Sequence, residues 1–179
     1  MAIHLVPACT EQQLLKIENL YMEAFPKEER KPFSLLIEKS REGTVDILSI
    51  ESDGNGMIGE AIVAKDRELA LLDYFAVSPQ LRNGGAGSCA LQMLQSRYAG
   101  HKFILEIEST LRPVPDLDLR RRRKAFYLRN DMKCMDYTVC LFGIEMEVLV
   151  HGEQVDFGKY HALYENIYGT EIAENIVLI

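Results

Sequence analysis

A glycine-rich loop between a predicted strand and a predicted helix most constrains the fold of this 179-residue chain. The loop, Ser78 to Gly85, follows an apolar strand predicted over Leu69 to Val77 and leads into a helix predicted over Ala86 to Tyr98. Phe103 to Glu108 then has the pattern of a further strand. A strand, a crossover helix and a strand in this order predict a parallel strand pair.

The residues before the loop predict an antiparallel meander, because strands at Val45 to Ile50 and Met57 to Ala64 flank the turn Ser52-Asp-Gly-Asn-Gly56. The other predicted strands are Ile3 to Val6, Cys134 to Leu141, Ile144 to Val150 and Glu174 to Ile179. A helix opens at Thr10, with Gln13 completing a capping box, and is stopped by Pro26. Further helices are predicted at Phe33 to Ser40, Asp118 to Arg129, which Asn130-Asp131 ends, and Asp156 to Tyr168. The pattern predicts a mixed α/β (α+β) fold, with helices on both faces of a central sheet of six to seven strands.

Length and composition predict one domain over residues 1–179 in a cytoplasmic protein. The net charge of −7 argues against nucleic acid and anionic membranes as partners. No apolar run approaches the roughly 18 residues of a membrane span, and the N-terminus lacks the pattern of a signal peptide. The four cysteines form no CxxC pair and the four histidines are scattered, so we expect no metal site.

The glycine loop predicts an anion site, because backbone N–H groups at a helix start lack partners and glycines let a phosphate approach closely. Arg82, within the loop, could add a charged contact. The sequence is not a Walker loop, since no Lys-Ser or Lys-Thr follows the last glycine. Gly85 to Ala90 fits a dinucleotide fingerprint, with Glu106 about 20 residues later, but seven residues separate Val77 from Gly85.

The order of elements and two motifs favour coenzyme A as the ligand. The segment Arg82-Asn-Gly-Gly85-Ala-Gly87, preceded by Phe75-Ala-Val77-Ser-Pro79, resembles the acetyl-CoA-binding motif of the GNAT superfamily of N-acyltransferases. Downstream, Phe126-Tyr127-Leu-Arg-Asn-Asp131-Met132 resembles the family's Phe-Tyr-x-x-x-Gly-Phe signature, with Asp-Met in place of Gly-Phe. The resemblance covers roughly residues 1–150 as the core, and residues 151–179 form an extension without a functional interpretation. Arg120 stands where many members carry an asparagine that contacts the coenzyme.

The resemblance implies a GNAT-like fold that uses acetyl-CoA as co-substrate and needs no metal. The pyrophosphate would bind the backbone N–H groups of the loop, and the pantetheine arm would pair with the strand that ends at Val77. The thioester would lie where this strand diverges from the strand at Phe103 to Glu108, and an N–H group near Val77 could polarise its carbonyl. The implied coenzyme-binding residues are Phe75, Ala76, Val77, Arg82, Asn83, Gly84, Gly85, Ala86, Gly87 and Ser88.

The acceptor implied by the resemblance is a primary amine, which must lose a proton before it attacks. Strand alternation puts Glu106 and Glu108 on one face, so either could be the base, with Glu108 preferred because it lies nearer the strand end. The alternative for both is an exposed edge or salt bridges to arginines. Tyr127 is the candidate acid for the leaving thiolate; without the resemblance it would be interpreted as a core tyrosine.

We therefore expect an N-acetyltransferase that moves an acetyl group directly to an amine-bearing small molecule or peptide within a ternary complex. Two other functions stay open: a non-catalytic module that binds acetyl-CoA as a sensor, and a dinucleotide-dependent oxidoreductase. The basic run Arg120 to Lys124 is interpreted as a solvated helix face, with one member available for the 3′-phosphate of the coenzyme. A homodimer formed through a sheet edge is compatible with such a fold.

Overall fold

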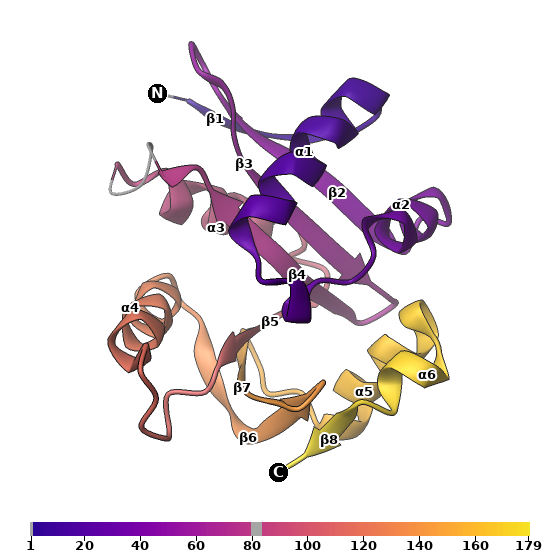
Figure 1. Ribbon diagram of the computed structural model, residues 1–179, viewed down its shortest axis with the longest axis vertical. Coiled ribbons are helices and arrows are strands. Elements are labelled where there is room, and N and C mark those ends of the chain that lie inside the picture. Colours follow the sequence, from indigo (N-terminus) through magenta and orange to yellow (C-terminus); the bar gives the residue numbers. More distant parts are fainter. Residues whose placement is uncertain (1, 80–83) are drawn as a thin grey trace. The chain divides into compact units, whose positions relative to one another are not determined.

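A computed structural model describes residues 2–79 and 84–179 (Figure 1). Within these residues the strands form one mixed sheet in the order β1-β2-β3-β4-β5-β7-β6-β8. The chain divides into two compact units, one made of Met1–Ala64 and Leu72–Arg97 and the other of Lys65–Leu71 and Tyr98–Ile179. The chain therefore passes from one unit to the other after Ala64, after Leu71 and after Arg97.

The first unit holds most of the predicted meander and the first crossover helix. Its elements are β1 (Ile3–Pro7), α1 (Glu11–Ala24), the 3-10 turn η1 (Lys27–Glu29), α2 (Phe33–Arg41), β2 (Val45–Ser52), β3 (Gly56–Lys65), β4 (Leu69–Val77) and α3 (Ala86–Arg97), with the ends of β3 and β4 at their joining turn assigned to the second unit. Antiparallel pairing of β2 with β3 confirms that part of the predicted meander, and β1 pairs antiparallel with the other side of β2, a pairing that was not predicted. Gly54 and Gly56 both have positive φ and form the turn predicted between β2 and β3.

The predicted capping box fixes the start of α1. The Oγ1 atom of Thr10 accepts a hydrogen bond from the backbone N–H of Gln13, and the Gln13 side chain accepts one from the N–H of Thr10. Two orphan N–H groups of the helix start are thereby satisfied, as the sequence predicted.

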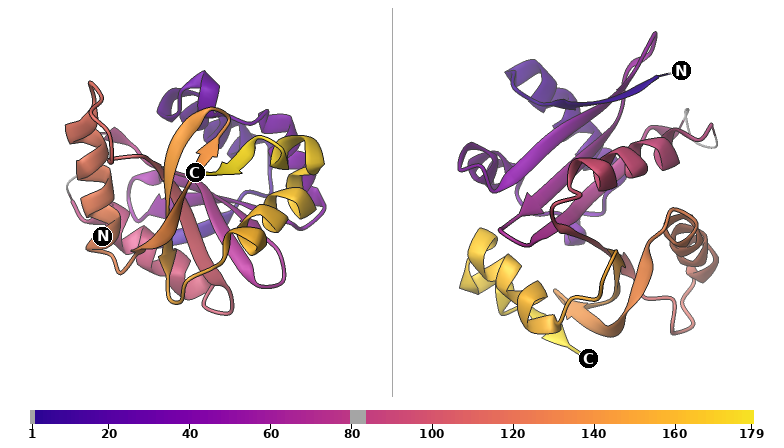
Figure 2. Two further views of the ribbon diagram at one scale, coloured as in Figure 1. Left: turned by 90° about the horizontal axis from the view of Figure 1, so that it is seen from below. Right: turned by 180° about the vertical axis from the view of Figure 1, so that it is seen from behind.

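Helices cover both faces of the strands in the first unit. The buried Tyr21 of α1 packs edge-on against Tyr74 of β4, with ring centroids 4.7 Å apart, so α1 lies on the face that carries Tyr74. Leu5 of β1 lines a shallow groove with Cys89 and Met93 of α3, so α3 covers the opposite face. Figure 1 shows α1 and α2 in front of these strands, and the reverse view in Figure 2 shows α3 in front.

The second unit is built on antiparallel pairing of β7 with both β5 and β6. Its elements are β5 (Lys102–Glu108), α4 (Leu117–Leu128), β6 (Lys133–Leu141), β7 (Ile144–His151), α5 (Phe157–Tyr168), α6 (Thr170–Ala173) and β8 (Ile176–Leu178). Asp131 adopts the left-handed backbone predicted after α4, with φ of 63°. Met132 is buried, as expected of a residue that replaces the phenylalanine of the family signature.

Residues 151–179 are an integral part of the second unit. Asp156 caps α5 by accepting a hydrogen bond from the N–H of Lys159, and the buried face of α5 includes Tyr160 and Tyr164. The short strand β8 pairs with β6 and adds an eighth strand to the six to seven expected. The helix α6 was not predicted, because four residues are too few to show a periodicity. The single domain over residues 1–179 stays a prediction.

Candidate functional site

The described part of the glycine loop ends at the start of α3, where the sequence predicts an anion site. Gly85 has φ of 80°, its carbonyl oxygen accepts the N–H of Cys89, and a Cβ atom added at Gly85 would meet no atom within 4 Å. The N–H groups of the first helical turn therefore have no intrahelical partner and border open space, which favours an anion. Gly84 and Gly85 are exposed, Ala86 is buried, and Gly87 and Ser88 are half-buried. The predicted contacts Arg82 and Asn83 lie outside the described residues.

The end of β4 is closely packed on β3. A Cβ atom at Gly59 would lie 2.4 Å from the carbonyl oxygen of Ala76, so only glycine fits there. The N–H of Ser78 donates to the carbonyl oxygen of Ile58 at 2.8 Å, which extends the pairing to the start of the glycine loop. Ala76 and Val77 are buried, whereas Phe75 is half-buried. The strand end predicted to bind the pantetheine arm is thus rigidly held.

A buried ion pair and Tyr74 fix the charged segment between α1 and α2 to β4. Lys31 donates from Nζ to both carboxylate oxygens of Asp73, at 2.8 and 2.9 Å, and the two side chains are 9% and 4% exposed. The Tyr74 hydroxyl donates to the carbonyl oxygen of Glu29 and accepts the N–H of Lys31. Sequence reasoning missed this anchor; its one signal was an aspartate inside an apolar strand.

Tyr127 lies in the last turn of α4, in the second unit. Its side chain is partly buried, and its hydroxyl donates to no other residue that the structure describes. Burial raises the pKa of Tyr127 to about 12, although nearby Arg123 opposes this shift. The phenol is therefore protonated at neutral pH and able to donate a proton, as the predicted role requires.

Glu108 is held by two arginines of α4. Arg120 and Arg123 each donate to one carboxylate oxygen at 2.9 Å, and the Glu108 side chain is 14% exposed. The ion-pair alternative considered for this residue is therefore the one observed. The interpretation of Arg120 to Lys124 as a solvated face is wrong for Arg120 and for Lys124, which are mostly buried, Lys124 pairing with Glu147 of β7. Arg123 is 54% exposed, as that interpretation expects. These pairs dock α4 on β5 and β7.

Glu106 has a different environment, formed by α5. The hydroxyls of Tyr160 and Tyr164 both donate to its Oε1 atom, the latter at 2.7 Å. Both tyrosines are completely buried. Sequence reasoning missed them because they come from the extension, more than 50 residues after Glu106. These hydroxyl groups connect α5 to β5 through the Glu106 carboxylate.

The anchor of α4 on β7 is a buried carboxylate. Glu147 is 5% exposed and accepts hydrogen bonds from the N–H and the hydroxyl of Thr110 and from Lys124. Burial raises the pKa of Glu147, but these donors outweigh burial and hold it below its usual range. The network fixes the helix that carries Tyr127.

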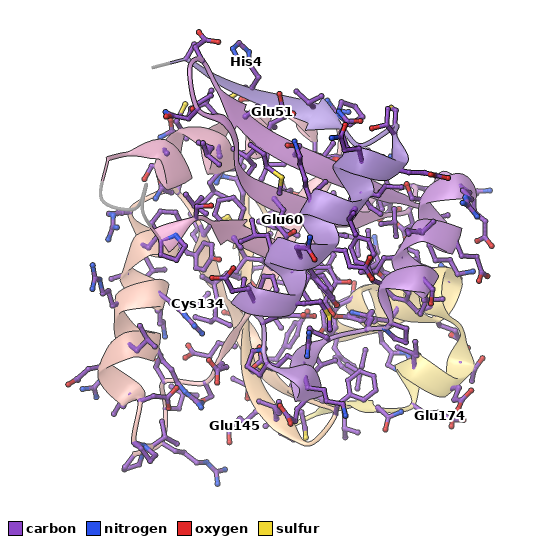
Figure 3. All side chains as sticks on the ribbon, turned by 45° about the horizontal axis from the view of Figure 1, so that its top comes forward. His4, Glu51, Glu60, Cys134, Glu145 and Glu174 are labelled. Carbon is purple, nitrogen blue, oxygen red and sulfur yellow. The ribbon has the colours of Figure 1, made fainter. Side chains whose placement is uncertain are left out.

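Glu60, in the middle of β3, is a buried carboxyl group that sequence reasoning also missed. Its side chain is completely buried, and neither oxygen has a hydrogen-bond partner among the described residues. Burial alone raises the pKa of Glu60 to about 8. The only sequence signal is a single acidic residue within an otherwise apolar strand. Figure 3 labels Glu60 close to α1.

Two further observations concern metal sites and membrane-spanning helices. In residues 2–79 and 84–179, no group of three or more histidine, cysteine, aspartate or glutamate side chains is placed to hold a metal ion. Over the same residues, no helix has the length and apolar character needed to cross a membrane.

Comparison with known proteins relates this chain to solved acetyltransferases. No family model and no curated protein sequence matches it. A solved structure described as an acetyltransferase of the GNAT family from Bacteroides thetaiotaomicron is 28% identical over 93% of this chain and 99% of its own, with a TM-score of 0.76.

Two more distant structures share the fold. An aminoglycoside 6′-N-acetyltransferase complexed with coenzyme A is 14% identical, covers 87% of this chain and 100% of its own, and has a TM-score of 0.67. A spermidine N-acetyltransferase from Vibrio cholerae in complex with CoA and spermine is 11% identical, covers 83% of this chain and 95% of its own, and has a TM-score of 0.62. The mixed sheet, the glycine loop before α3 and these likenesses agree: the chain has the GNAT fold and is similar to solved acetyltransferases of the GNAT family.

Proposed function

We propose that this protein transfers an acetyl group from acetyl-CoA to a primary amine, directly and within a ternary complex. The observation that carries the proposal is the start of α3. There a Cβ atom at Gly85 would meet no atom within 4 Å, and the N–H groups of the first helical turn have no intrahelical partner, which supports a pyrophosphate site at this point of the chain.

The residues of the first unit would bind the coenzyme. Gly84 to Ser88 would hold the diphosphate on backbone N–H groups, and Phe75 to Val77 would pair with the pantetheine arm as an added strand. Arg82 and Asn83 belong to the same proposal. The tight packing of Ala76 on Gly59 supports it, because a rigid strand end loses little entropy when it orients a thioester.

Tyr127 is the proposed acid. The Tyr127 hydroxyl donates to no acceptor among the described residues. Because the pKa of Tyr127 is raised, the phenol keeps its proton until a thiolate forms. When the C–S bond breaks, this proton would pass to the coenzyme sulfur.

Glu106 and Glu108 remain candidates for the base, with Glu108 first. Both carboxylates are already engaged by neighbouring side chains, Glu108 by two arginines and Glu106 by two tyrosines. The same observation favours a second candidate function, a module that binds acetyl-CoA without turnover.

The test of the proposal is thiol release from acetyl-CoA across a panel of amines. Spermidine and an aminoglycoside belong in the panel, because compared structures are named for those acceptors. We expect thiol release with at least one amine. Coenzyme binding without thiol release for any amine would instead support the non-catalytic module.

Tyr127→Phe separates acid catalysis from coenzyme binding. We expect kcat to fall about 100-fold with an unchanged dissociation constant for acetyl-CoA, because only the proton donor is lost. Tyr137→Phe is the matched control: this tyrosine also has a raised pKa and a hydroxyl without a hydrogen-bond partner, but it lies outside both motifs. Equal activity of wild type and Tyr127→Phe would remove Tyr127 from the mechanism.

A further inference from the structure

Glu60 has a position that protein stability does not explain. It is completely buried, and no described donor reaches either carboxyl oxygen. A buried carboxyl group without partners costs folding free energy, which an apolar residue of similar size would avoid. A glutamate at this point of β3 therefore calls for a role other than packing.

Glu60 lies beside the strand end that is proposed to hold the thioester. The hydrogen bond from the N–H of Ser78 to the carbonyl oxygen of Ile58 sets the antiparallel pairing of β3 with β4. Two residues further along each strand, Glu60 is opposite Ala76, and their side chains share one face of the sheet. The small side chain of Ala76 is therefore the cross-strand neighbour of Glu60 on β4.

The titratable groups on this face are engaged elsewhere. The Tyr21 hydroxyl of α1 donates to the carbonyl oxygen of Lys31, and the Tyr74 hydroxyl of β4 donates to that of Glu29. Lys31 pairs with Asp73. On β2, Ser49 is the cross-strand partner of Glu60 and carries no charge.

Burial is consequently the only influence on the ionisation of Glu60, and it raises the pKa to about 8. A base is most effective when its pKa is close to the working pH. Glu106 and Glu108, by contrast, each contact two donor side chains, so both carboxylates are already engaged within the fold.

We propose that Glu60 is the base that removes a proton from the acceptor amine, a role that rests on the acetyl transfer proposed above. The ammonium form of the acceptor gives one proton to the Glu60 carboxylate, directly or through a water molecule. The amine nitrogen then forms a C–N bond to the acetyl carbon, the C–S bond breaks, and the thiolate takes the Tyr127 proton. The second proton lost by nitrogen restores Tyr127 through water, and Glu60 releases its proton to solvent.

The experiment compares pH profiles of kcat/KM for the wild type, Glu60→Gln and Ser49→Ala, with one amine that supports thiol release. Glutamine has the shape of the protonated acid, so we expect Glu60→Gln to fold and to bind acetyl-CoA with a dissociation constant within twofold of the wild type. We expect its kcat/KM to fall about 100-fold at pH 8. The ionisation of the amine affects all three profiles equally.

An inflection of kcat/KM near pH 8 is the feature that would identify Glu60 as the base. It should be present in the wild type and in Ser49→Ala, absent in Glu60→Gln, and retained with lower activity in Glu60→Asp, which keeps a carboxyl group. Full activity and an unchanged inflection in Glu60→Gln would overturn this role while leaving the acetyl transfer intact. A wild type that releases no thiol with any amine would overturn the acetyl transfer itself.

Discussion

A single glycine sets how closely β3 and β4 approach. Gly59 has no side chain, and a Cβ atom there would lie 2.4 Å from the carbonyl oxygen of Ala76 and 3.2 Å from Cα of Val77. Because both atoms belong to the backbone, a larger residue could be accepted only if the strands moved apart.

Gly59→Ala is therefore expected to destabilise the protein by about 1–3 kcal/mol, measured by urea unfolding. Gly100→Ala is the control, because a Cβ atom there meets nothing within 4 Å and the backbone at Gly100 has no positive φ. We also expect Gly59→Ala to weaken acetyl-CoA binding, since the shifted strand end carries Ala76. Equal stability of the two variants would contradict the close approach of β3 and β4.

Glu60 should make stability depend on pH. Burial raises its pKa from 4.5 in the unfolded chain to about 8 in the folded protein. Below pH 4.5 both states hold the proton and nothing is lost; between pH 4.5 and 8 only the folded state holds it, so stability falls as pH rises. The loss is about 1.4 kcal/mol per pH unit at most.

Glu60→Gln removes this titration. The variant should gain free energy of unfolding relative to the wild type between pH 5 and pH 8.5, as measured by urea unfolding at both values. A constant difference between the two proteins would show that Glu60 titrates normally.

At the scale of elements, α5 is attached to β5 through hydroxyl groups. Tyr160 and Tyr164 donate to Glu106, while the neighbouring Tyr137 hydroxyl is buried without a hydrogen-bond partner among the described residues. The hydroxyls of Tyr160 and Tyr164 therefore stabilise the fold through hydrogen bonds, whereas the hydroxyl of Tyr137 does not.

Tyr164→Phe should cost about 1.5–3 kcal/mol of stability, because it removes a hydrogen bond to a charged group. Tyr137→Phe should be neutral or stabilising, since it deletes a buried hydroxyl that has no partner. Chemical denaturation of both variants measures the difference. If Tyr137→Phe were the more damaging change, the Glu106 contacts would not be what holds α5.

The elements were largely predictable from sequence because their signals are local. The capping box at Thr10, the turn around Gly54 and the left-handed residue Asp131 each involve a few neighbouring residues, and the structure confirms all three. Long-range partners leave no such signal. The arginines that hold Glu108 were interpreted as solvated, and the tyrosines that hold Glu106 lie in a segment without a functional interpretation.

At the scale of the molecule, the motifs predicted the superfamily but not the state of its ionisable groups. Glu106 and Glu108 were singled out because they alternate on a strand, which says nothing about what faces them. Glu60 was overlooked because one acidic residue in an apolar strand has no periodicity. Charge states depend on burial and donors, which only the assembled fold provides.

Unfolding experiments test directly which ligand binds the glycine loop. At 100 times its dissociation constant, acetyl-CoA should stabilise the protein by about 2.7 kcal/mol and raise the unfolding midpoint, whereas NAD should have no effect. Gly85→Val should abolish the shift, since a β-branched residue disfavours φ of 80° at the start of α3.

Gly54→Val is the matched control, because Gly54 has φ of 86° in the β2–β3 turn, outside the coenzyme motif. Both variants carry similar backbone strain, and only Gly85→Val should lose the response to acetyl-CoA. Protection by NAD and not by acetyl-CoA would support the dinucleotide alternative. Loss of the response in both variants would mean that strain, and not the cradle of N–H groups before α3, controls binding.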